Sequence, residues 1–311
     1  MKVYHSLEGV PEASGPSSIA IGNFDGVHLG HQALLTAMLE QAKLRGVLAT
    51  VVTFFPHPAE VLNPDRPVER LSSPEEKLSL LEEMGVDRVL VIPFSRDIAA
   101  MEPETFYQNF LRSRLCAVSI HVGFNFRFGR NRRGTTDLLK ELGAKESVDV
   151  MVQPPFEVAN ERVSSTLIRN LIRSGKVDEV LPYLGRPYSL SSQVVRGDGR
   201  GRQLGYPTAN LKPRPGKILP KLGVYAARGV WQKQAFFAAA NLGIRPTIAQ
   251  GASSVALEVH LLDFEAQLYG ELIRVEFLKR VRDEMKFASV EELKSQIARD
   301  VKWIRESINQ E

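Results

Sequence analysis

Up to about residue 184, short apolar runs alternate along the chain with stretches whose apolar positions recur at helical spacing. The stretch at 31–45 carries one such stripe, formed by Leu34, Leu35, Met38 and Ala42. The stretch at 74–84 opens with a serine, a proline and two glutamates, which is typical of a capped helix start. Unbroken apolar runs separated by helices favour a doubly wound parallel sheet. The expected strands are 18–23, 48–55, 88–92, 117–123 and 148–153, and the expected helices are about 31–45, 74–84, 103–115, 135–143 and 165–174.

The pattern changes after the segment 184–187, Leu-Gly-Arg-Pro. From there, β-like runs follow one another with Gly and Pro between them and no helical pattern to separate them, which predicts an antiparallel sheet or small barrel. A final helix with one apolar stripe is expected at 290–308. The sequence therefore predicts two domains, an α/β domain at 1–184 and a β domain at 185–311. The β-like runs are 193–196, 224–231, 235–242, 255–262 and 272–278.

Length and charge agree with two globular domains. The chain has 311 residues, and domains hold roughly 100–200 residues each. There are 40 Lys and Arg against 36 Asp and Glu, so the net charge is only +4 and the surface should be mixed. Two arginine clusters, at 127–133 and 196–202, lie beside glycines and suit a phosphate-bearing partner. Composition leaves open whether that partner is nucleic acid or a small polyphosphate.

The single cysteine, Cys116, excludes an intrachain disulfide and fits a reducing compartment. The segment Met1–Ser18 lacks an apolar stretch of the length that a signal peptide needs. No apolar run of ~18 residues occurs, so no membrane span is expected. We therefore expect a cytoplasmic protein that does not bind membranes.

The first candidate for chemistry is the segment 22–31, Gly-Asn-Phe-Asp-Gly-Val-His-Leu-Gly-His, between the first strand and the first helix. In an open α/β sheet phosphates bind here, because the helix N-terminus offers free N–H groups and the positive end of its dipole. The three glycines let a ligand approach the backbone. His28 and His31 are three residues apart, project from one side of the opening turn, and can donate hydrogen bonds to phosphate oxygens.

Two alternatives for this segment stay open. A His-x-x-His pair can bind a metal, although no third strong ligand lies nearby in the sequence and Cys116 is distant. A plain turn with incidental histidines is the other reading. The segment fits neither the P-loop pattern nor the dinucleotide fingerprint, so neither of those sites is predicted.

The second candidate is the segment 197–210, in which four glycines fall among nine residues. Such a segment predicts a flexible loop that a ligand can approach closely, and not a strand. Thr208 and Asn210 are two residues apart, so an extended backbone would put both side chains on one face. A hydroxyl and an amide oxygen together can ligate Mg²⁺ and contact phosphate. A decorated hairpin loop is the alternative.

Taken together, these segments resemble the bifunctional riboflavin kinase/FMN adenylyltransferases, the prokaryotic FAD synthetases. The pattern Gly-x-Phe-Asp-Gly-x-His-x-Gly-His is similar to the H-x-G-H nucleotidyltransferase signature in the form that FAD synthetases use, and Pro-Thr-Ala-Asn at 207–210 resembles the riboflavin kinase signature. The likeness covers nearly the whole chain. It continues through 53–58, 122–129 and 163–169 in the first half, and through 219–226, 241–247, 258–264 and 282–287 in the second.

For the first half, the resemblance implies a Rossmann-like nucleotidyltransferase sheet that turns FMN and ATP into FAD and pyrophosphate. The FMN phosphate is already a nucleophile, so positioning and charge neutralisation are enough for catalysis. His28 and His31 would be the catalytic residues, and Asn125 stands where the family also shows Asp. The residues implied to bind ATP or phosphate are Gly22, Phe24, Asp25, Gly26, Gly30, Asn125, Ser164, Ser165, Thr166 and Arg169.

For the second half, the resemblance implies a six-stranded antiparallel barrel with a terminal helix, which phosphorylates riboflavin to FMN. Glu258 would be the general base for the 5′-hydroxyl, since a hydroxyl benefits from a base, whereas the strand pattern alone also fits a solvent-facing residue. Mg²⁺ would bind at Thr208 and Asn210, with ATP as co-substrate. Arg282 and Phe287 would bind the flavin. The implied ATP and phosphate contacts are Gly199, Gly201, Arg202, Pro207, Thr208 and Asn210.

The expected partners are riboflavin, FMN, FAD and ATP, and no nucleic acid is expected to bind. The protein is expected to be a monomer or a weak oligomer. Ser192 and Arg196 depart from the family's usual Gly and His, at positions that carry no chemistry. Three alternatives remain: a basic RNA-binding barrel, a chain with one live activity, and a different adenylyl acceptor at the first site. The arginines lie in glycine loops without interleaved aromatic residues, which disfavours the first of these.

Overall fold

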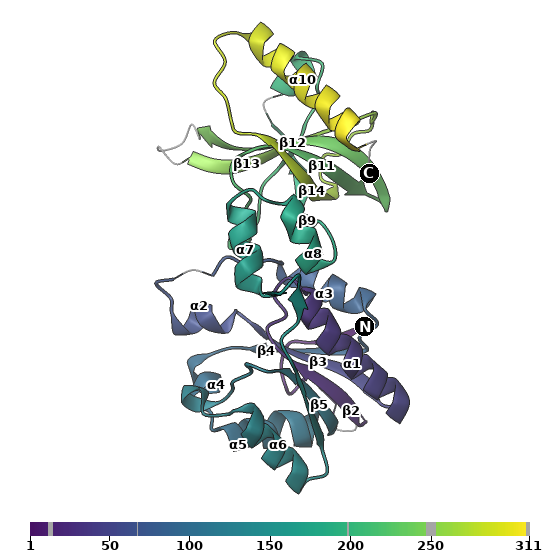
Figure 1. The fold of residues 1–311 in the computed structure, drawn as a ribbon, viewed down its shortest axis with the longest axis vertical. Coiled ribbons are helices and arrows are strands. Elements are labelled where there is room, and N and C mark those ends of the chain that lie inside the picture. Colours follow the sequence, from purple (N-terminus) through teal and green to yellow (C-terminus); the bar gives the residue numbers. More distant parts are fainter. Residues whose placement is uncertain (12–14, 67, 198, 247–252, 309–311) are drawn as a thin grey trace. The chain divides into compact units, whose positions relative to one another are not determined.

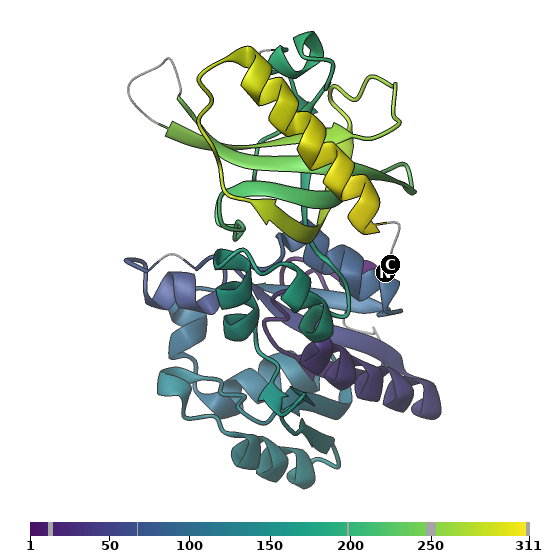
Figure 2. The ribbon, with the colours of Figure 1, turned by 45° about the horizontal axis from the view of Figure 1, so that its top comes forward.

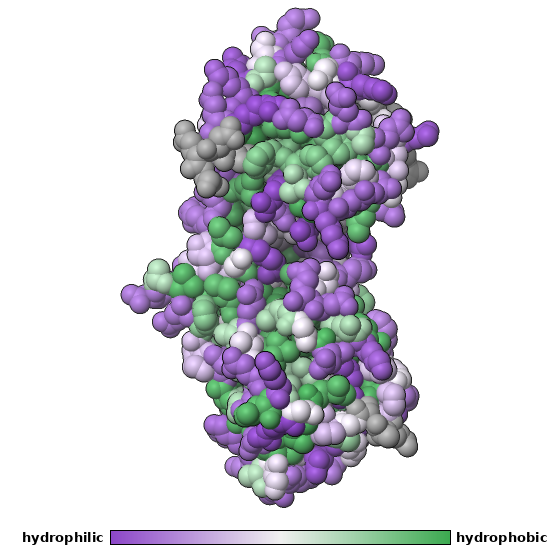
Figure 3. Space-filling view, turned by 90° about the vertical axis from the view of Figure 1, so that its right-hand side faces the viewer, coloured by the Kyte–Doolittle hydropathy of each residue, from purple (hydrophilic) through white to green (hydrophobic). Residues whose placement is uncertain are grey.

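The structure is a computed structural model that describes residues 1–11, 15–66, 68–197, 199–246 and 253–308. It divides into two compact units, the N-terminal unit Met1–Ser165 and the C-terminal unit Thr166–Glu311. Asp198, in the glycine segment 197–210, and Thr247, in the segment 241–247, lie outside the described residues. Hydrophilic and hydrophobic residues are interspersed over the face drawn in Figure 3. No helix within the described ranges is long and apolar enough to cross a membrane.

The N-terminal unit is built on a parallel sheet of six strands in the order β1-β4-β3-β2-β5-β6 (Figure 1). Five strands match the expected runs to within about two residues, and all neighbouring strands pair in parallel. The short first strand was not predicted, because three half-exposed residues carry no periodic signal. The strands are β1 Lys2–Tyr4, β2 Ser17–Ile21, β3 Leu48–Phe55, β4 Arg88–Pro93, β5 Ala117–Gly123 and β6 Asp149–Gln153.

Helices cover both faces of this sheet. All five residues of β2 are buried, and Ile19 and Ile21 pack into one apolar cluster while Ala20 packs into the other. The predicted stripe of α1 is confirmed as its buried set. Ser73 is the expected N-cap of α3, and it forms a capping box there with Glu76. The helices are α1 Leu29–Arg45, α2 Pro58–Leu62, α3 Pro74–Glu83, α4 Arg96–Ala100, α5 Pro103–Phe106 continued by a π-helix η1 Tyr107–Arg114, a short 3₁₀ turn η2 Arg130–Arg132, and α6 Thr136–Lys145, with a hairpin of β7 Glu157–Val158 and β8 Glu161–Arg162.

The strand order fixes where this unit can bind a ligand. β2 lies between β3 and β5, and the chain crosses to one side after β2 and returns to the other side at β5. The carboxyl ends of β2 and β5 therefore form the topological switch point of the sheet, which is where open α/β sheets bind ligands. The histidine segment leaves from β2, and the segment with Asn125 leaves from β5.

The C-terminal unit contains the predicted six-stranded antiparallel barrel, closed in the order β10-β13-β12-β11-β14-β9. The terminal helix α10, Val290–Ile308, lies across the outside of the barrel (Figure 2). Val301 and Ile304 pack there against Ala226 and Leu262, whereas Val290, the first residue of the predicted stripe, is 59% exposed. The strands are β9 Tyr188–Val195, β10 Ala209–Leu211, β11 Gly223–Trp231, β12 Gln234–Pro246, β13 Ser253–Leu261 and β14 Leu272–Arg282, and a short helix α9 spans Arg200–Gln203.

The segment between the sheet and the barrel is helical, with α7 Ser165–Arg173, a 3₁₀ turn η3 Asp178–Val180 and α8 Leu181–Leu184. From Thr166 onward it belongs to the C-terminal unit. The Lys221 amide donates to the Ile172 carbonyl at 3.3 Å, and a Cβ at Gly175 would come within 2.7 Å of the Arg280 side chain. The helical segment therefore packs on the barrel, although its sequence pattern resembles the helices of the N-terminal unit.

Candidate active sites

The Gly22–His28 loop, which joins β2 to α1, is held firmly by the segment that precedes α3. Asp25 is buried, and its Oδ1 accepts hydrogen bonds from the amides of Leu71 at 2.8 Å and Ser72 at 3.2 Å. The Gly26 amide donates to the Ser72 hydroxyl at 3.1 Å. These contacts give Asp25 a role in shaping the loop, and its contact with nucleotide stays a prediction.

Glycine is required in this loop by close packing. Phe24 is fully buried at a φ of 49°, and a Cβ on Gly22 would lie 3.2 Å from its ring. Gly26 has a φ of 79°, and a Cβ there would come within 2.8 Å of Leu71. The Phe24 ring therefore packs against the backbone of the loop. Gly22 and Gly26 stand where a larger residue would press against Phe24 or Leu71.

His28 is the N-cap of α1, because its Nδ1 accepts a hydrogen bond from the His31 amide at 3.3 Å. A neutral ring that accepts at Nδ1 carries its proton at Nε2, so Nε2 is the donor. The His28 and His31 rings are stacked, with centroids 3.6 Å apart and planes at 14°. A Cβ on Gly30 would lie 3.3 Å from the His28 ring, so the glycine of the H-x-G-H pattern makes room for that ring. The prediction that both imidazoles share one side of the opening turn is confirmed.

His31 is electrically neutral at physiological pH. Burial lowers the pKa of His31 well below 6.5, and the neighbouring His28 and Lys77 lower it further. Its Nδ1 is buried and has no hydrogen-bond partner among the described residues. A neutral imidazole still offers one N–H donor, so His31 can bind a phosphate oxygen as a dipole rather than as a cation.

Two further predicted segments begin at or near this site. The Ser165 hydroxyl donates to the Asp25 carbonyl at 3.1 Å, which attaches the first residue of α7 to the loop, and Ser164 directly precedes it. Asn125 is exposed in the loop that follows β5. Thr166 and Arg169 belong to the C-terminal unit, so their contribution to the nucleotide site stays a prediction.

Sequence reasoning missed one charged residue beside the loop. The Lys77 ammonium donates to the Asn23 carbonyl at 2.9 Å and to the Thr53 hydroxyl at 3.1 Å. Lys77 lies on α3, which is distant from the signature in sequence, and a lysine after two glutamates looks like an ordinary solvated helix position. The arginine cluster at 127–133, by contrast, is mostly exposed, and Arg130 and Arg133 pair there with Glu102.

In the C-terminal unit, the glycine segment wraps tightly around the Pro-Thr-Ala-Asn motif. A Cβ on Gly201 would come within 2.5 Å of the Tyr206 carbonyl and 3.0 Å of the Thr208 hydroxyl. A Cβ on Gly197 would overlap the Asn210 carboxamide. The glycines therefore let the backbone lie directly against the two side chains that were expected to act, and Asn210 is only 7% exposed.

The remaining predicted residues of this segment lie in or beside α9. Gly199 has a φ of 71° and its carbonyl accepts from the Arg202 amide at 3.1 Å, while the Arg202 side chain is exposed. The Pro207 carbonyl contacts His260 Nδ1 at 2.8 Å. The motif is thereby linked to β13, the strand that carries Glu258.

Strand register brings the predicted kinase residues together. Glu258 on β13 is the direct cross-strand partner of Asn210 on β10 and of Asn241 on β12. Directly paired residues of an antiparallel sheet point to the same face, with Cβ atoms about 5 Å apart. Leu257 and Val259 are buried on the opposite face, so Glu258 projects outward from the barrel. Asn241 was not singled out from the sequence, and the register is what places it in this row.

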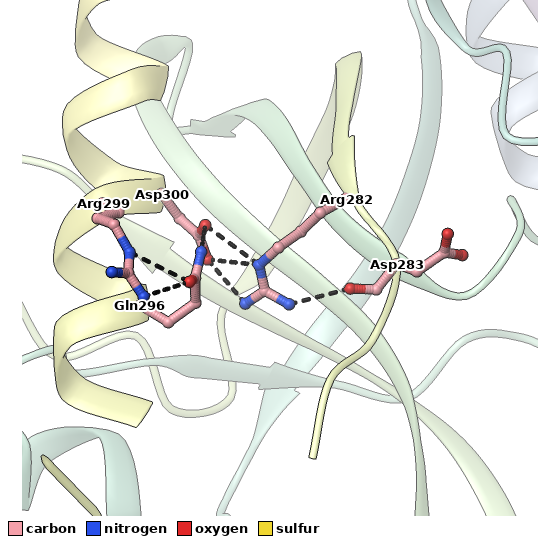
Figure 4. A network of polar contacts seen from close by, with 5 residues as sticks. All are labelled: Arg282, Asp283, Gln296, Arg299 and Asp300. Atoms are coloured by element: carbon pink, nitrogen blue, oxygen red, sulfur yellow. Dashed lines mark hydrogen bonds and ion pairs between the residues drawn. The ribbon is translucent and has the colours of Figure 1, made fainter. Parts of the chain in front are cut away.

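The predicted flavin residues lie on the same outer side, where α10 covers the barrel. Arg282 donates from Nε and Nη2 to both carboxylate oxygens of Asp300, over 2.7 to 3.1 Å (Figure 4). Gln296 donates to Asp300 at 2.8 Å, and the Arg282 guanidinium lies 5.9 Å from the centre of the Phe287 ring. Arg282 and Phe287 are therefore neighbours, as expected of one binding surface, and α10 holds the guanidinium in place.

The donor atoms available for a metal are oxygens. Thr208 offers a hydroxyl and Asn210 an amide oxygen, and the Asn210 amide nitrogen donates to the Thr208 carbonyl at 3.4 Å. Mg²⁺ prefers oxygen ligands and is commonly held by one or two protein groups together with nucleotide phosphates. Within the described part of the chain, no group of three or more His, Cys, Asp or Glu side chains is arranged to hold a metal. The Thr208–Asn210 pair therefore fits Mg²⁺ that arrives with ATP.

Comparison with known proteins assigns one family model to each half of the chain. A family model for FAD synthetase matches residues 10–167, and one for riboflavin kinase matches residues 184–308. The bifunctional riboflavin kinase/FMN adenylyltransferase of Escherichia coli (strain K12) is 39% identical over 304 residues, which are 97% of this chain and 95% of that protein. Its counterpart from Buchnera aphidicola subsp. Schizaphis graminum is 35% identical over 312 residues, covering 99% of each.

A solved structure shares both units. The crystal structure of a protein from Streptococcus pneumoniae that is named a macrolide-efflux protein aligns with a TM-score of 0.87 and 31% sequence identity, over 97% of this chain and 98% of that one. The two family models and the curated relatives agree on the activities, and they confirm the resemblance drawn from the motifs. The chain belongs to the bifunctional riboflavin kinase/FMN adenylyltransferase family, and it phosphorylates riboflavin to FMN and adenylylates FMN to FAD.

Proposed function

We propose that FMN is adenylylated at the Gly22–His28 loop and that riboflavin is phosphorylated on the outer face of the barrel around Glu258. The observation that supports the second assignment best is the strand register, which sets Glu258 directly beside Asn210. The observation that supports the first is the stacked pair His28 and His31 at the switch point of the sheet.

In adenylyl transfer, an oxygen of the FMN phosphate attacks the α-phosphorus of ATP, and pyrophosphate leaves. No proton has to be removed from the nucleophile, so the site has to orient two anions and balance the charge of the transition state. The Nε2 proton of His28, the neutral imidazole of His31 and the backbone amides at the start of α1 are the donors we assign to this task. Arg169 and the Ser164–Thr166 segment are assigned to the ATP phosphates.

In the kinase reaction, the 5′-hydroxyl of riboflavin attacks the γ-phosphorus of ATP, and ADP leaves. Glu258 takes the hydroxyl proton as general base. General-base catalysis typically raises a rate by about 10²–10⁴-fold. Asn210, and with it Asn241 on the neighbouring strand, flanks the carboxylate and orients it. Arg282 and Phe287 are assigned to the flavin ring.

Mg²⁺ should be required for both reactions. Each reaction moves a phosphorus centre that carries several negative charges, and Mg²⁺ neutralises part of that charge. Incubation with riboflavin, ATP and Mg²⁺ should give FMN first and then FAD, whereas excess chelator should stop both steps. Chromatography of the flavins measures this, and full conversion in the presence of chelator would contradict the requirement.

The boundary at 184/185 stays a prediction, and the helical segment from Thr166 to Leu184 allows it to be tested. A chain that begins near Leu184 should still phosphorylate riboflavin, since about 125 residues suffice for an autonomous domain. It loses the Ile172–Lys221 hydrogen bond, worth about 1 kcal/mol, so it should melt a few degrees below a chain that begins at Thr166. Equal melting temperatures would show that this segment does not stabilise the barrel, and a folded but inactive short chain would contradict the boundary.

We propose further that the protein works in the cytoplasm as a monomer or weak oligomer without nucleic acid or membrane partners. Its only cysteine and its flavin and nucleotide substrates support a reducing, ATP-rich compartment. Sedimentation of the purified protein measures the oligomeric state. A salt titration of RNA binding tests whether the protein has a nucleic-acid partner, because electrostatic RNA binding would appear as a steep loss of affinity with rising salt.

A further inference from the structure

The ammonium of Lys77 is half-buried beside the Gly22–His28 loop. Burial lowers the pKa of Lys77 to about 8, even though the charge of Asp25 raises it, and Arg70 lowers it further. Its hydrogen-bond acceptors are two neutral oxygens, the carbonyl of Asn23 and the hydroxyl of Thr53. Across the described residues, Lys77 makes no ion pair. A half-buried cation whose direct hydrogen-bond partners are neutral is costly, and the charge of Asp25 offsets only part of that cost.

The position of the Lys77 ammonium indicates what its charge does. Asn23 belongs to the loop that leads from β2 to the histidines, and Thr53 lies near the carboxyl end of β3. The Thr53 hydroxyl also donates to the Asn23 carbonyl at 3.2 Å, which closes a triangle with the Lys77 ammonium. The charge is near enough to His31 to lower the pKa of that ring. An ammonium has three N–H donors, and its contacts with Asn23 and Thr53 leave one of them for a ligand.

We propose that Lys77 is a positioning residue of the adenylyltransferase site, which clamps the Asn23 carbonyl of the histidine loop to β3 and adds a positive charge that substrate phosphates balance. The proposal rests on the assignment of FMN adenylylation to this loop. It extends the site to α3, an element outside the signature segments.

The test compares two substitutions within the triangle. Lys77→Met removes the charge and its hydrogen bonds, whereas Thr53→Val removes one neutral partner and keeps the charge. We expect Lys77→Met to lower kcat/KM for adenylyl transfer by about 10²-fold, the scale for losing one electrostatic donor, and Thr53→Val to lower it by less than about tenfold. Riboflavin phosphorylation, measured on the same preparations, should not change. A loss of less than about threefold in Lys77→Met, or equal losses in both variants, would overturn the role of the charge.

The pH profile gives a readout that a purely structural lysine would not move. With a pKa of about 8, Lys77 loses its charge as the pH rises, so wild-type adenylyl transfer should decline above about pH 8. The groups that face it are Asp25, Arg70 with its partner Glu60, and His31, and of these His31 is already neutral in this range. Lys77→Arg keeps its charge at these pH values, so the alkaline decline should shift to higher pH in that variant. An identical decline in wild type and Lys77→Arg would contradict the proposal.

Stability separates loss of the charge from loss of the fold. Because the folded chain binds the Lys77 proton more weakly than the unfolded chain, whose lysine pKa is near 10.5, the buried charge opposes folding at neutral pH. The melting temperature of Lys77→Met should therefore stay within a few degrees of wild type. If that variant does not fold, the profiles of wild type and Lys77→Arg decide. If His31→Ala also keeps full adenylyl transfer, the loop is not the site at all, and the proposed function fails rather than this inference alone.

Discussion

Replacing Glu258 by glutamine should lower riboflavin phosphorylation by about 10²–10⁴-fold, while FMN adenylylation stays close to wild type. Glutamine has the same shape as glutamate and keeps the row of polar side chains with Asn210 and Asn241, but it cannot take a proton from the 5′-hydroxyl. Supplied with riboflavin and ATP, the variant should leave riboflavin unconverted. Supplied with FMN and ATP, it should still form FAD.

A matched control lies five residues further along the chain. Asp263 is an exposed carboxylate that follows β13 and pairs with Arg305 on α10 at 2.8 Å. Asp263→Asn removes one negative charge from the same unit, at a position outside the polar row, and should leave both activities unchanged. If Glu258→Gln retained more than about a tenth of the kinase rate, Glu258 would be the solvent-facing strand residue that its sequence pattern also allows.

Replacing His31 by alanine should lower adenylyl transfer by about 10²–10³-fold, the scale for losing one preorganised donor. Since His31 is neutral, the loss is that of an oriented N–H and of the stacked support for His28. FMN should therefore accumulate when the variant is given riboflavin and ATP. Because the pKa of His31 lies well below 6.5, protonation of this ring should not change the wild-type rate between pH 8 and 6.5.

His5 provides the control for this variant, because it is an exposed histidine of the same unit, just after β1. His5→Ala should form FAD at the wild-type rate. A wild-type FAD yield from His31→Ala would reduce the histidine pair to an ordinary helix start, and the adenylyl site would have to be sought elsewhere in the sheet.

Much of the fold follows from periodicity in the sequence. Five strands of the parallel sheet are short apolar runs and α1 carries one apolar stripe, so these elements could be located from the chain alone. Elements without such a pattern were missed. The strand β10 has three residues and follows a glycine loop, and α2 and α4 have five residues each, too few for a stripe to show.

The candidate sites were predictable where one continuous segment carries them. The order Gly-x-Phe-Asp-Gly-x-His-x-Gly-His gave the histidines, although not that Phe24 is buried beneath the loop or that Asp25 binds backbone amides. Lys77 and Asn241 join their sites through tertiary contacts from other elements. No local pattern marks such residues, so the three-dimensional structure was needed to find them.

The most direct test of two separate sites on one chain is complementation between two inactive variants. Glu258→Gln should make no FAD from riboflavin because it forms no FMN, and His28→Ala should make none because it stops at FMN. A mixture of the two should make FAD from riboflavin, since FMN released by the second variant can be adenylylated by the first. If each variant keeps its remaining activity and the mixture makes FAD, the two-site account holds. If Glu258→Gln is folded and yet unable to adenylylate FMN, so that the mixture makes none, a single composite site must replace it.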